Sequence, residues 1–297
     1  MREIVYSFTG ESDRSVLDFL KREKGYSARI ITKLRKSPGT ILINGKHART
    51  VDILTDGDEL RIKLPDAPGD IKGVNLPLKV VYEDEDLLIA DKPAGMAVHP
   101  TRRHQGDTLA DAVAYYLGKK GIRTAFRAVN RLDRDTSGAV VIALNEYSAC
   151  RLQRSLKKEY FAVVQGIVEG EGRIDAPIYR INERSIMRAV GEQGKRAVTN
   201  YKSLLCDAEK TLLKCTLETG RTHQIRVHFS SISHPLVGDD MYGAEISDLT
   251  RQALHCGKVE FVHPVSGEEM SVKCPPGEDI CALFGKTPEE IQLLIYT

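Results

Sequence analysis

The sequence lacks several features that would assign it to a particular class of protein. Its apolar runs are all far shorter than the roughly 20 residues that a membrane-spanning helix needs. The first five residues do not begin the apolar block of a signal peptide. Its six cysteines contain no Cys-x-x-Cys pair, and we find no internal repeat or low-complexity segment. These absences predict a cytoplasmic protein with reduced thiols, no contact with membranes and no bound metal.

What the sequence does contain is an ordinary globular composition, 41% hydrophobic and 28% charged, in 297 residues. A chain of this length is expected to form two domains. The net charge of +2 is uneven, because residues 1–65 hold 13 Lys and Arg against 9 Asp and Glu. Residues 21–36 hold seven basic residues and one acidic residue. Such a stripe suits a phosphate backbone, although a solvated helix face is the simpler interpretation of a charge run.

The first 65 residues have the pattern of a small separate module. Ser12 or Asp13 is expected to cap a helix over 14–24, and Ser27 to cap a second, basic helix. A strand, an Asn-Gly turn and an alternating strand ending at Leu64 follow. Over roughly residues 12–64 this order resembles the S-four-type RNA-binding domain, a small α/β module. The RNA contacts that we expect on it are Arg22, Arg29, Lys33, Arg35 and Lys36.

Residues 66–77 have the proline and glycine content of an extended linker. We expect a second domain over 78–297, in which strands outnumber helices and do not alternate with them regularly. That pattern predicts an α+β fold with a mixed, largely antiparallel sheet. Two of its helices are expected to begin near Thr108, where Asp111 completes a capping box, and near residue 146.

Residues 130–138 have the sequence Asn-Arg-Leu-Asp-Arg-Asp-Thr-Ser-Gly. Asp133 therefore lies between Arg131 and Arg134, and an apolar run over 139–144 follows directly. This pattern predicts a polar loop that leads into a buried strand. A carboxylate among guanidinium groups on a loop held by a rigid element is typical of a functional site.

A second polar segment follows an alternating strand predicted over 211–218. Gly220 turns the chain, and Thr222 is expected to cap a helix whose apolar face carries residues 225, 228, 229 and 232. Two arginines, Arg221 and Arg226, then lie at the electropositive start of that helix. This arrangement suits the binding of a carboxylate or a phosphate.

His223 and His228 raise the question of a metal site. Their i, i+5 spacing separates them by about 140° around a helix, and no glutamate accompanies them as in a His-Glu-x-x-His motif. Core packing or contact with RNA therefore explains these histidines better than a metal ion does.

Together the two segments resemble the signature segments of the RluA family of RNA pseudouridine synthases. The matching stretches are Arg-Leu-Asp-Arg-Asp-Thr-Ser-Gly at 131–138 and Arg-Thr-His-Gln-Ile-Arg-Val-His at 221–228. Supporting matches are Lys-Pro-Ala-Gly at 92–95, Lys-Glu-Tyr at 158–160 and His-Pro-Leu-Val-Gly-Asp at 234–239. The resemblance covers about residues 78–275 and implies isomerisation of uridine in RNA to pseudouridine, without a cofactor.

The resemblance also implies roles for single residues. Asp133 corresponds to the nucleophile, Arg226 to the arginine that pairs with it, and Tyr160 to an active-site tyrosine; Arg221 is an alternative partner for the aspartate. Whether the aspartate attacks ribose or base, or removes a proton from the sugar, stays open. Asn130 stands where the family usually has histidine, which argues against a titrating group at that position. The expected substrate contacts are Arg131, Arg134, Arg221, His223 and Gln224.

Family habit favours ribosomal RNA over transfer RNA as the partner, and a monomer is expected. Two other interpretations of the sequence stay open. One is an RNA-binding or assembly factor with a silent catalytic fold, against which the intact set of Asp133, Tyr160 and Arg226 argues. The other is a hydrolase that uses Asp133 and Asp135 as acid and base or as metal ligands.

Overall fold

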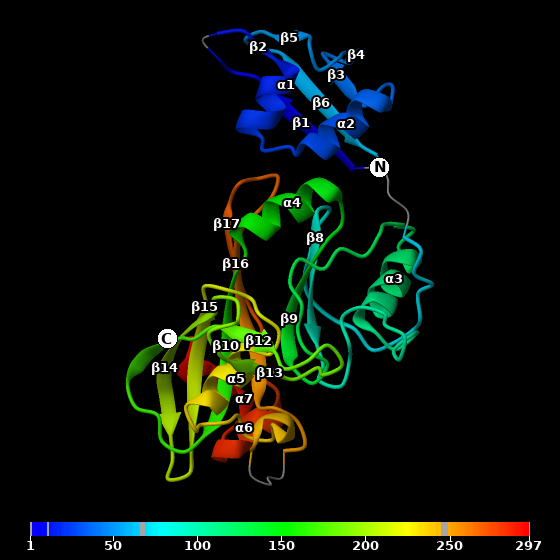
Figure 1. Ribbon diagram of the computed structural model, residues 1–297. Coiled ribbons are helices and arrows are strands. Elements are labelled where there is room, and N and C mark those ends of the chain that lie inside the picture. Colours follow the sequence, from blue (N-terminus) through cyan, green and yellow to red (C-terminus); the bar gives the residue numbers. More distant parts are fainter. Residues whose placement is uncertain (1, 11, 66–68, 245–248, 297) are drawn as a thin grey trace.

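The computed structural model describes residues 2–10, 12–65, 69–244 and 249–296. Figure 1 shows a small N-terminal module above one end of a long sheet, with helices α4, α3, α5, α6 and α7 arranged around that sheet. None of the helices in the described ranges combines the length and apolar composition that crossing a bilayer requires.

The N-terminal module has its own sheet and its own apolar core. Among the described residues, four strands pair in the order β1-β6-β3-β4. The alternation predicted for β6 is confirmed, because Leu60, Ile62 and Leu64 are buried. Asn44 and Gly45 both have positive φ, as a tight hairpin turn requires. The elements are β1 (Arg2–Ser7), β2 (Arg14–Ser15), α1 (Val16–Asp18), α2 (Ala28–Lys36), β3 (Ile41–Ile43), β4 (Lys46–His47), β5 (Ile53–Leu54) and β6 (Glu59–Leu64).

The N-cap prediction is confirmed for one of the two helices of this module and wrong for the other. Ser27 caps α2 by accepting a hydrogen bond from the backbone N–H of Ile30, as predicted. The prediction that Ser12 or Asp13 caps the first helix is wrong. Residues 14–15 pair as a short strand with β5, so Ser15 becomes the cap of α1, and the helix continues as π-helix over Phe19–Glu23.

The predicted linker lies partly outside the described residues, at 66–68. Residues 69–77 have no regular secondary structure, as predicted, but they pack against α3 (Leu109–Lys119). The N–H of Val74 bonds to the carbonyl of Asp111, and a Cβ on Gly73 would lie 2.3 Å from the backbone nitrogen of Tyr115. Glycine is therefore required where this segment crosses the helix.

The second domain is built on one large sheet, which confirms the predicted α+β class. Among the described strands the order is β11-β14-β15-β10-β16-β9-β8-β7, with β17 also paired to β16. Of these pairs only β16 with β9 is parallel. The strands are β7 (Lys79–Glu83), β8 (Leu87–Lys92), β9 (Ser137–Ala143), β10 (Lys157–Gln165), β11 (Glu171–Asp175), β14 (Val198–Cys206), β15 (Lys210–Leu217), β16 (Leu254–Val262) and β17 (Glu269–Lys273).

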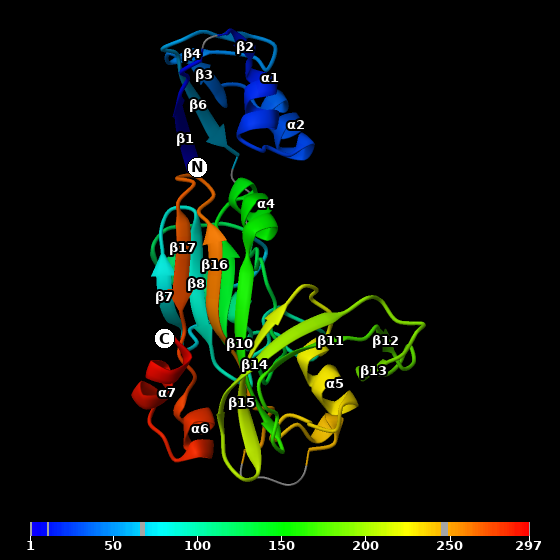
Figure 2. The ribbon, with the colours of Figure 1, turned by 90° about the vertical axis from the view of Figure 1, so that its left-hand side faces the viewer.

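The helices of this domain cover opposite faces of the sheet (Figure 2). On one face α5 packs Ile225 and Phe229 into the cluster that contains Tyr160 of β10. On the other face α6 and α7 pack against Phe161, which follows Tyr160 in the same strand. A hairpin of β12 and β13 projects beside α5 in Figure 2. The remaining elements are α4 (Glu146–Ser155), β12 (Ile178–Arg180), β13 (Arg188–Val190), α5 (Gln224–Ser231), α6 (Glu278–Cys281) and α7 (Pro288–Ile295).

The module and the second domain meet at α4. Tyr147 of α4 belongs to the apolar core of the module, where its ring centroid lies 4.3 Å from that of Tyr26. Arg2 of β1 donates to both carboxylate oxygens of the buried Asp86, at 2.8 and 3.1 Å. These contacts hold the basic helix α2 in one orientation relative to the large sheet.

Candidate active site

A cavity of about 320 Å³ lies where three segments meet, namely residues 129–136, the start of β10 and the start of α5. It brings together the two polar segments identified in the sequence, although Asp133 and Arg226 are 93 residues apart. The predicted site residues that line it are Arg131, Asp133, Tyr160, Arg221, His223, Gln224 and Arg226.

The loop that carries Asp133 is fixed at both ends. Leu132 is buried beside it, and the N–H of Thr136 bonds to the carbonyl of Asp133, which closes a turn. Strand β9, which follows, is buried throughout, as predicted. Gly138 has φ of 111°, and a Cβ there would lie 2.3 Å from the carbonyl oxygen of Cys256. Only glycine fits this close approach of β9 to β16, so the position of Asp133 follows from the packing around it.

Asn130 attaches the start of this loop to β9. Its amide nitrogen donates to the carbonyl of Ala139 at 3.0 Å, and its amide oxygen accepts from the N–H of Val141 at 2.8 Å. The side chain thus pairs with the strand as a neighbouring backbone would. An amide supplies one donor and one acceptor at once, which gives Asn130 a structural use that needs no titration.

The start of α5 differs from the prediction. The N-cap is His223 rather than Thr222, and it has a left-handed backbone with φ of 57° and no side-chain cap. Histidine is one of the residue types that adopt this conformation more often than most. The consequence is that the His223 ring lies over the cavity, with Nε2 3.9 Å from an oxygen of Asp133.

Gln224 fastens this turn to the sheet. Its amide oxygen accepts from the hydroxyl of Thr219 and from the N–H of Arg221, and its amide nitrogen donates to the carbonyl of Val198. Both ends of the amide are therefore used within the protein. In this conformation Gln224 positions the helix, which differs from its predicted role as a substrate contact.

Arg226 is the charged partner of Asp133. Its Nη1 lies 3.4 Å from Oδ2 of Asp133, and the arginine side chain is 5% exposed while the aspartate is 28% exposed. The alternative partner, Arg221, is exposed and donates instead to the carbonyl of Arg196. Arg226 also forms two shorter hydrogen bonds to Asp239, at 2.6 and 2.7 Å. Although burial opposes charge, these carboxylates raise the pKa of Arg226.

Tyr160 lies on the floor of the cavity in the middle of the sheet. It pairs with Cys215 on one side and Cys256 on the other. Burial raises the pKa of Tyr160 well above its ordinary value. Its hydroxyl is therefore neutral at pH 7, so the side chain offers an aromatic face and a hydroxyl rather than a phenolate.

The two arginines that flank Asp133 point in different directions. Arg131 is exposed and lines the cavity. Arg134 does not line it and pairs with Asp135 at 3.1 Å on the outer side of the loop. Asp135 does not line the cavity either. The described residues thus give the hydrolase interpretation no second carboxylate from this loop, and Arg134 is not placed to contact a substrate there.

Comparison with known proteins identifies the family of this chain. A family model described as RNA pseudouridylate synthase matches residues 86–231. The uncharacterized RNA pseudouridine synthase YjbO of Bacillus subtilis is 35% identical over 270 residues, which cover 88% of this chain and 95% of that protein. This chain belongs to the RNA pseudouridine synthases. The ribosomal large subunit pseudouridine synthase D of Xanthomonas campestris is 36% identical to the synthase, with 85% and 82% of the two chains covered.

A solved structure supports the same assignment of the fold. The human RNA pseudouridylate synthase domain containing 1 aligns with the synthase at a TM-score of 0.57 and 27% identity. The alignment covers 76% of this chain and 97% of the human one. The family suggested by the two sequence motifs is therefore confirmed.

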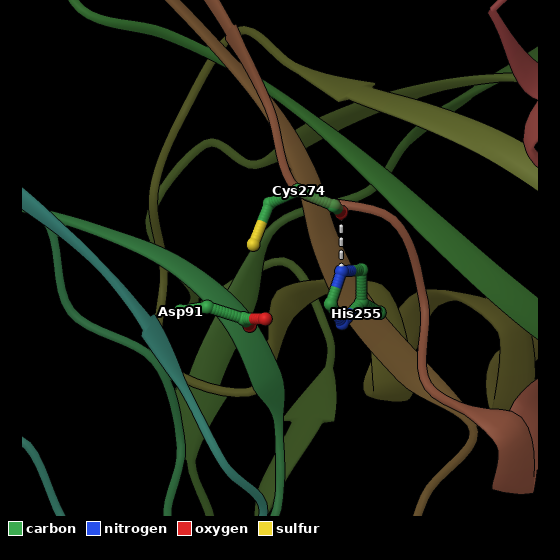
Figure 3. A group of neighbouring side chains, drawn as sticks. All are labelled: Asp91, His255 and Cys274. Carbon is green, nitrogen blue, oxygen red and sulfur yellow. Dashed lines mark hydrogen bonds between the residues drawn. The ribbon is translucent and has the colours of Figure 1, made fainter. Parts of the chain in front are cut away.

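One group of side chains away from the cavity has the residue types of a metal site. Donor atoms of Asp91, His255 and Cys274 lie within 4.8 Å of one another (Figure 3). However, Nε2 of His255 bonds to the carbonyl of Cys274 at 2.6 Å, and Nδ1 bonds to the hydroxyl of Ser137 at 2.9 Å. Both ring nitrogens are thus engaged, and burial lowers the pKa of His255. In this conformation His255 braces the end of the Asp133 loop, and its nitrogens are not free to bind a metal.

A second such group, Asp84, Asp86 and His263, lies at the junction with the N-terminal module. His263 bonds to Asp84 through Nε2 and accepts from the N–H of Ser266 through Nδ1. Asp86 accepts hydrogen bonds from Arg2, as described above. The donor atoms of this group are therefore also engaged in hydrogen bonds within the protein.

The sequence motifs did not assign a role to three residues near the cavity. Lys92 is completely buried, and its ammonium group donates to the carbonyls of Pro93, Met96 and Arg134 at 2.7 to 2.9 Å. Asp239 and Tyr242 contact Arg226 and His223 from behind. Lys92 and Asp239 belong to short stretches that supported the family resemblance, and those matches could have drawn attention to the two residues. No feature of the sequence pointed to Tyr242.

The basic residues predicted to bind RNA are distributed over several surfaces of the module. Arg22, Arg29, Arg35 and Lys36 are exposed, and Nε of Arg35 donates to the hydroxyl of Thr50. Lys33 is directed toward α4, where it donates to Glu146. Lys33 therefore contributes to the junction rather than to the free surface of the module.

Proposed function

We propose that the synthase converts specific uridines in RNA to pseudouridine and that Asp133 is the nucleophile. The observation that carries this proposal is the position of the Asp133 carboxylate. It is partly exposed in the cavity, 3.4 Å from the buried guanidinium of Arg226, and the aromatic side chain of Tyr160 lines the same cavity. An anion with a fixed cationic partner beside an aromatic surface suits a reaction on a nucleotide.

The reaction moves one bond and keeps the atoms of the substrate. The bond between ribose C1′ and uracil N1 breaks, the base rotates, and a bond from C1′ to C5 forms. N1 gains a proton and C5 loses its proton, so no oxidant, reductant or cofactor is consumed. Asp133 would act on the glycosidic bond, and the neutral Tyr160 would carry the stacked base while it turns. A phenol with a raised pKa could exchange a proton through its hydroxyl only late, once C5 has become acidic.

The target base must leave its helix to reach this cavity. Enzymes that act on a base in a folded nucleic acid commonly extrude the nucleotide into a pocket. Arg131 is exposed at the cavity and next to Asp133 in sequence, so it is placed to hold such a nucleotide out of the stack. Arg221 and His223 at the start of α5 would contact the phosphate or the base from the other side.

We assign RNA recognition to residues 1–65, joined by the segment 66–77 to a catalytic domain over 78–297. Arg22, Arg29 and Lys36 on the free surface of the module can contact phosphate groups. Because one relative is named for the large ribosomal subunit, ribosomal RNA is the proposed substrate in preference to transfer RNA.

Release of tritium from RNA labelled at C5 of uracil tests the proposed function. We expect the purified synthase to release tritium from ribosomal RNA of cells that lack its gene. Chelation of metal ions should leave the rate unchanged, because no metal takes part. Tight binding of that RNA without any release, or loss of activity on chelation, would contradict the proposal.

A further inference from the structure

We propose that Asp239 and Tyr242 are positioning residues that aim Arg226 and His223 at the reacting carboxylate. They would turn one N–H of each side chain toward a different oxygen of Asp133. Both residues belong to one short segment that follows α5. This segment packs against Arg226 and His223 on the side away from Asp133. The inference rests on the proposed role of Asp133 as the reacting group.

The first arm runs from Asp239 to Arg226. Nε and Nη2 of the guanidinium donate to the two oxygens of Asp239 at 2.6 and 2.7 Å, and both side chains are buried. A guanidinium held at two nitrogens in this way keeps a fixed plane. Nη1, which Asp239 does not engage, lies 3.4 Å from Oδ2 of Asp133. Asp239 thus fixes the orientation in which Arg226 meets Asp133 through a single nitrogen.

The segment that carries Asp239 is itself rigid. Gly238 has φ of 73°, and a Cβ there would lie 2.2 Å from the carbonyl oxygen of Arg251. The N–H of Asp239 bonds to the carbonyl of Leu236, and the carbonyl of Asp239 accepts from the N–H of Tyr242. The backbone therefore fixes where the carboxylate of Asp239 points.

The second arm runs from Tyr242 to His223. The tyrosine hydroxyl accepts from the N–H of Arg188 at 3.0 Å and lies 2.8 Å from Nδ1 of His223. If the hydroxyl donates its one hydrogen to Nδ1, the proton of a neutral imidazole is on Nε2. That atom lies 3.9 Å from Oδ1 of Asp133. Burial, and then the charge of Arg226, lower the pKa of His223, although Asp133 opposes this shift, so the ring is neutral at pH 7.

The two arms account for the charge around Asp133. A buried carboxylate, Asp239, balances the charge of Arg226, and the neutral His223 adds a donor without adding charge. Lys92 at the end of β8, the neutral Tyr160 of β10 and Tyr242 also interact electrostatically with Asp133, and the exposed Arg131 lines the same cavity. Asp133 is therefore left with one long contact to a cation, and its oxygens remain accessible from the cavity. A carboxylate paired at two nitrogens with arginine would be a weaker nucleophile.

The exchange Asp239→Asn tests the first arm, with Asp240→Asn as its matched control because Asp240 is the exposed neighbour. In Asp239→Asn the full charge of Arg226 acts on Asp133. We expect kcat for tritium release to fall by about 10-fold or more while KM changes by less than about 3-fold. The acid limb of the single-turnover rate should move to lower pH, which loss of folded protein alone would not cause. Asp240→Asn should behave as the wild type.

The exchange Tyr242→Phe tests the second arm and keeps the proposal testable if Asp239→Asn fails to fold. It retains the ring that lies against Arg226 but removes the hydroxyl that orients His223. We expect a several-fold lower kcat with KM nearly unchanged. Folded variants with wild-type kcat and an unmoved acid limb would overturn the inference. If Asp133→Asn itself kept its turnover, the proposed function would fail first, and the two failures are thereby distinguished.

Discussion

Among single residues, Lys92 shows how a buried side chain outside the cavity holds the loop that carries Asp133. Its three ammonium hydrogens meet three carbonyl oxygens, one of which belongs to Arg134, the residue after Asp133. Burial lowers the pKa of Lys92 to about 7. The negative charges of Asp135, Asp133 and Asp91 oppose that shift. Three carbonyl acceptors match the three hydrogens of the charged form.

We expect Lys92→Met to destabilise the synthase by about 2–4 kcal/mol, because three buried carbonyls lose their donor. The loop should also become more mobile, so that kcat falls several-fold. Chemical denaturation and tritium release measure the two effects. Lys202→Met is the matched control, since Lys202 is exposed on β14, and it should change the free energy of unfolding by less than about 0.5 kcal/mol. Equal stabilities for the two variants would contradict this role.

The sequence predicted the residues that line the cavity, but not the residues that hold those side chains in place. Asp133, Tyr160, Arg221, His223 and Arg226 lie in motifs whose chemistry is visible locally, and the structure brings them into one cavity. The partners of Lys92 are backbone carbonyls, which a sequence does not distinguish from one another. Asp239 and Tyr242 contact α5 only through the folding of a later segment. Such contacts depend on tertiary structure and could not be derived from spacing.

Among the elements, α2 carries the basic residues of the module in two environments. Arg29 and Lys36 are exposed, whereas Lys33 is paired with Glu146 of α4. The hydrophobic pattern and the Ser27 cap predicted the helix correctly, and Ile30, Ile31 and Leu34 are buried. The pattern could not show that one basic residue faces a helix more than a hundred residues away.

The double variant Arg29→Ala with Lys36→Ala should weaken the binding of RNA. Each lost phosphate contact is expected to reduce the slope of log K against log salt by about 0.7–0.9. Lys33→Ala, the control, should leave that slope nearly unchanged because its charge is already paired. Titrations at several salt concentrations measure the slope. Identical slopes for the double variant and the wild type would show that these residues form only a solvated helix face.

Helix α5 shows where capping rules were insufficient. Threonine is a favoured N-cap, so Thr222 was the natural choice. The helix instead begins one residue later, after a left-handed His223, because Gln224 ties the turn to β14 through Val198. A tertiary hydrogen bond thus overrides the local preference and places the imidazole over the cavity.

In the whole molecule, the large sheet joins the site to the N-terminal module. Asp133 precedes β9, Tyr160 lies in β10, and α4, which lies between these strands in sequence, supplies Tyr147 to the core of the module. The excess of strands over helices, without regular alternation between the two, predicted the α+β class. The order of strands and the parallel pairing of β9 with β16 could not be predicted, because these strands are more than a hundred residues apart.

Tritium release under single-turnover conditions by Asp133→Asn and Asp135→Asn tests the central claim most directly. The two residues share one loop, but only Asp133 lines the cavity, while Asp135 pairs with Arg134 outside it. We predict that Asp133→Asn abolishes release while its affinity for RNA stays within a few-fold of the wild type. Asp135→Asn should retain most of the wild-type rate. Substantial release by Asp133→Asn would contradict the account.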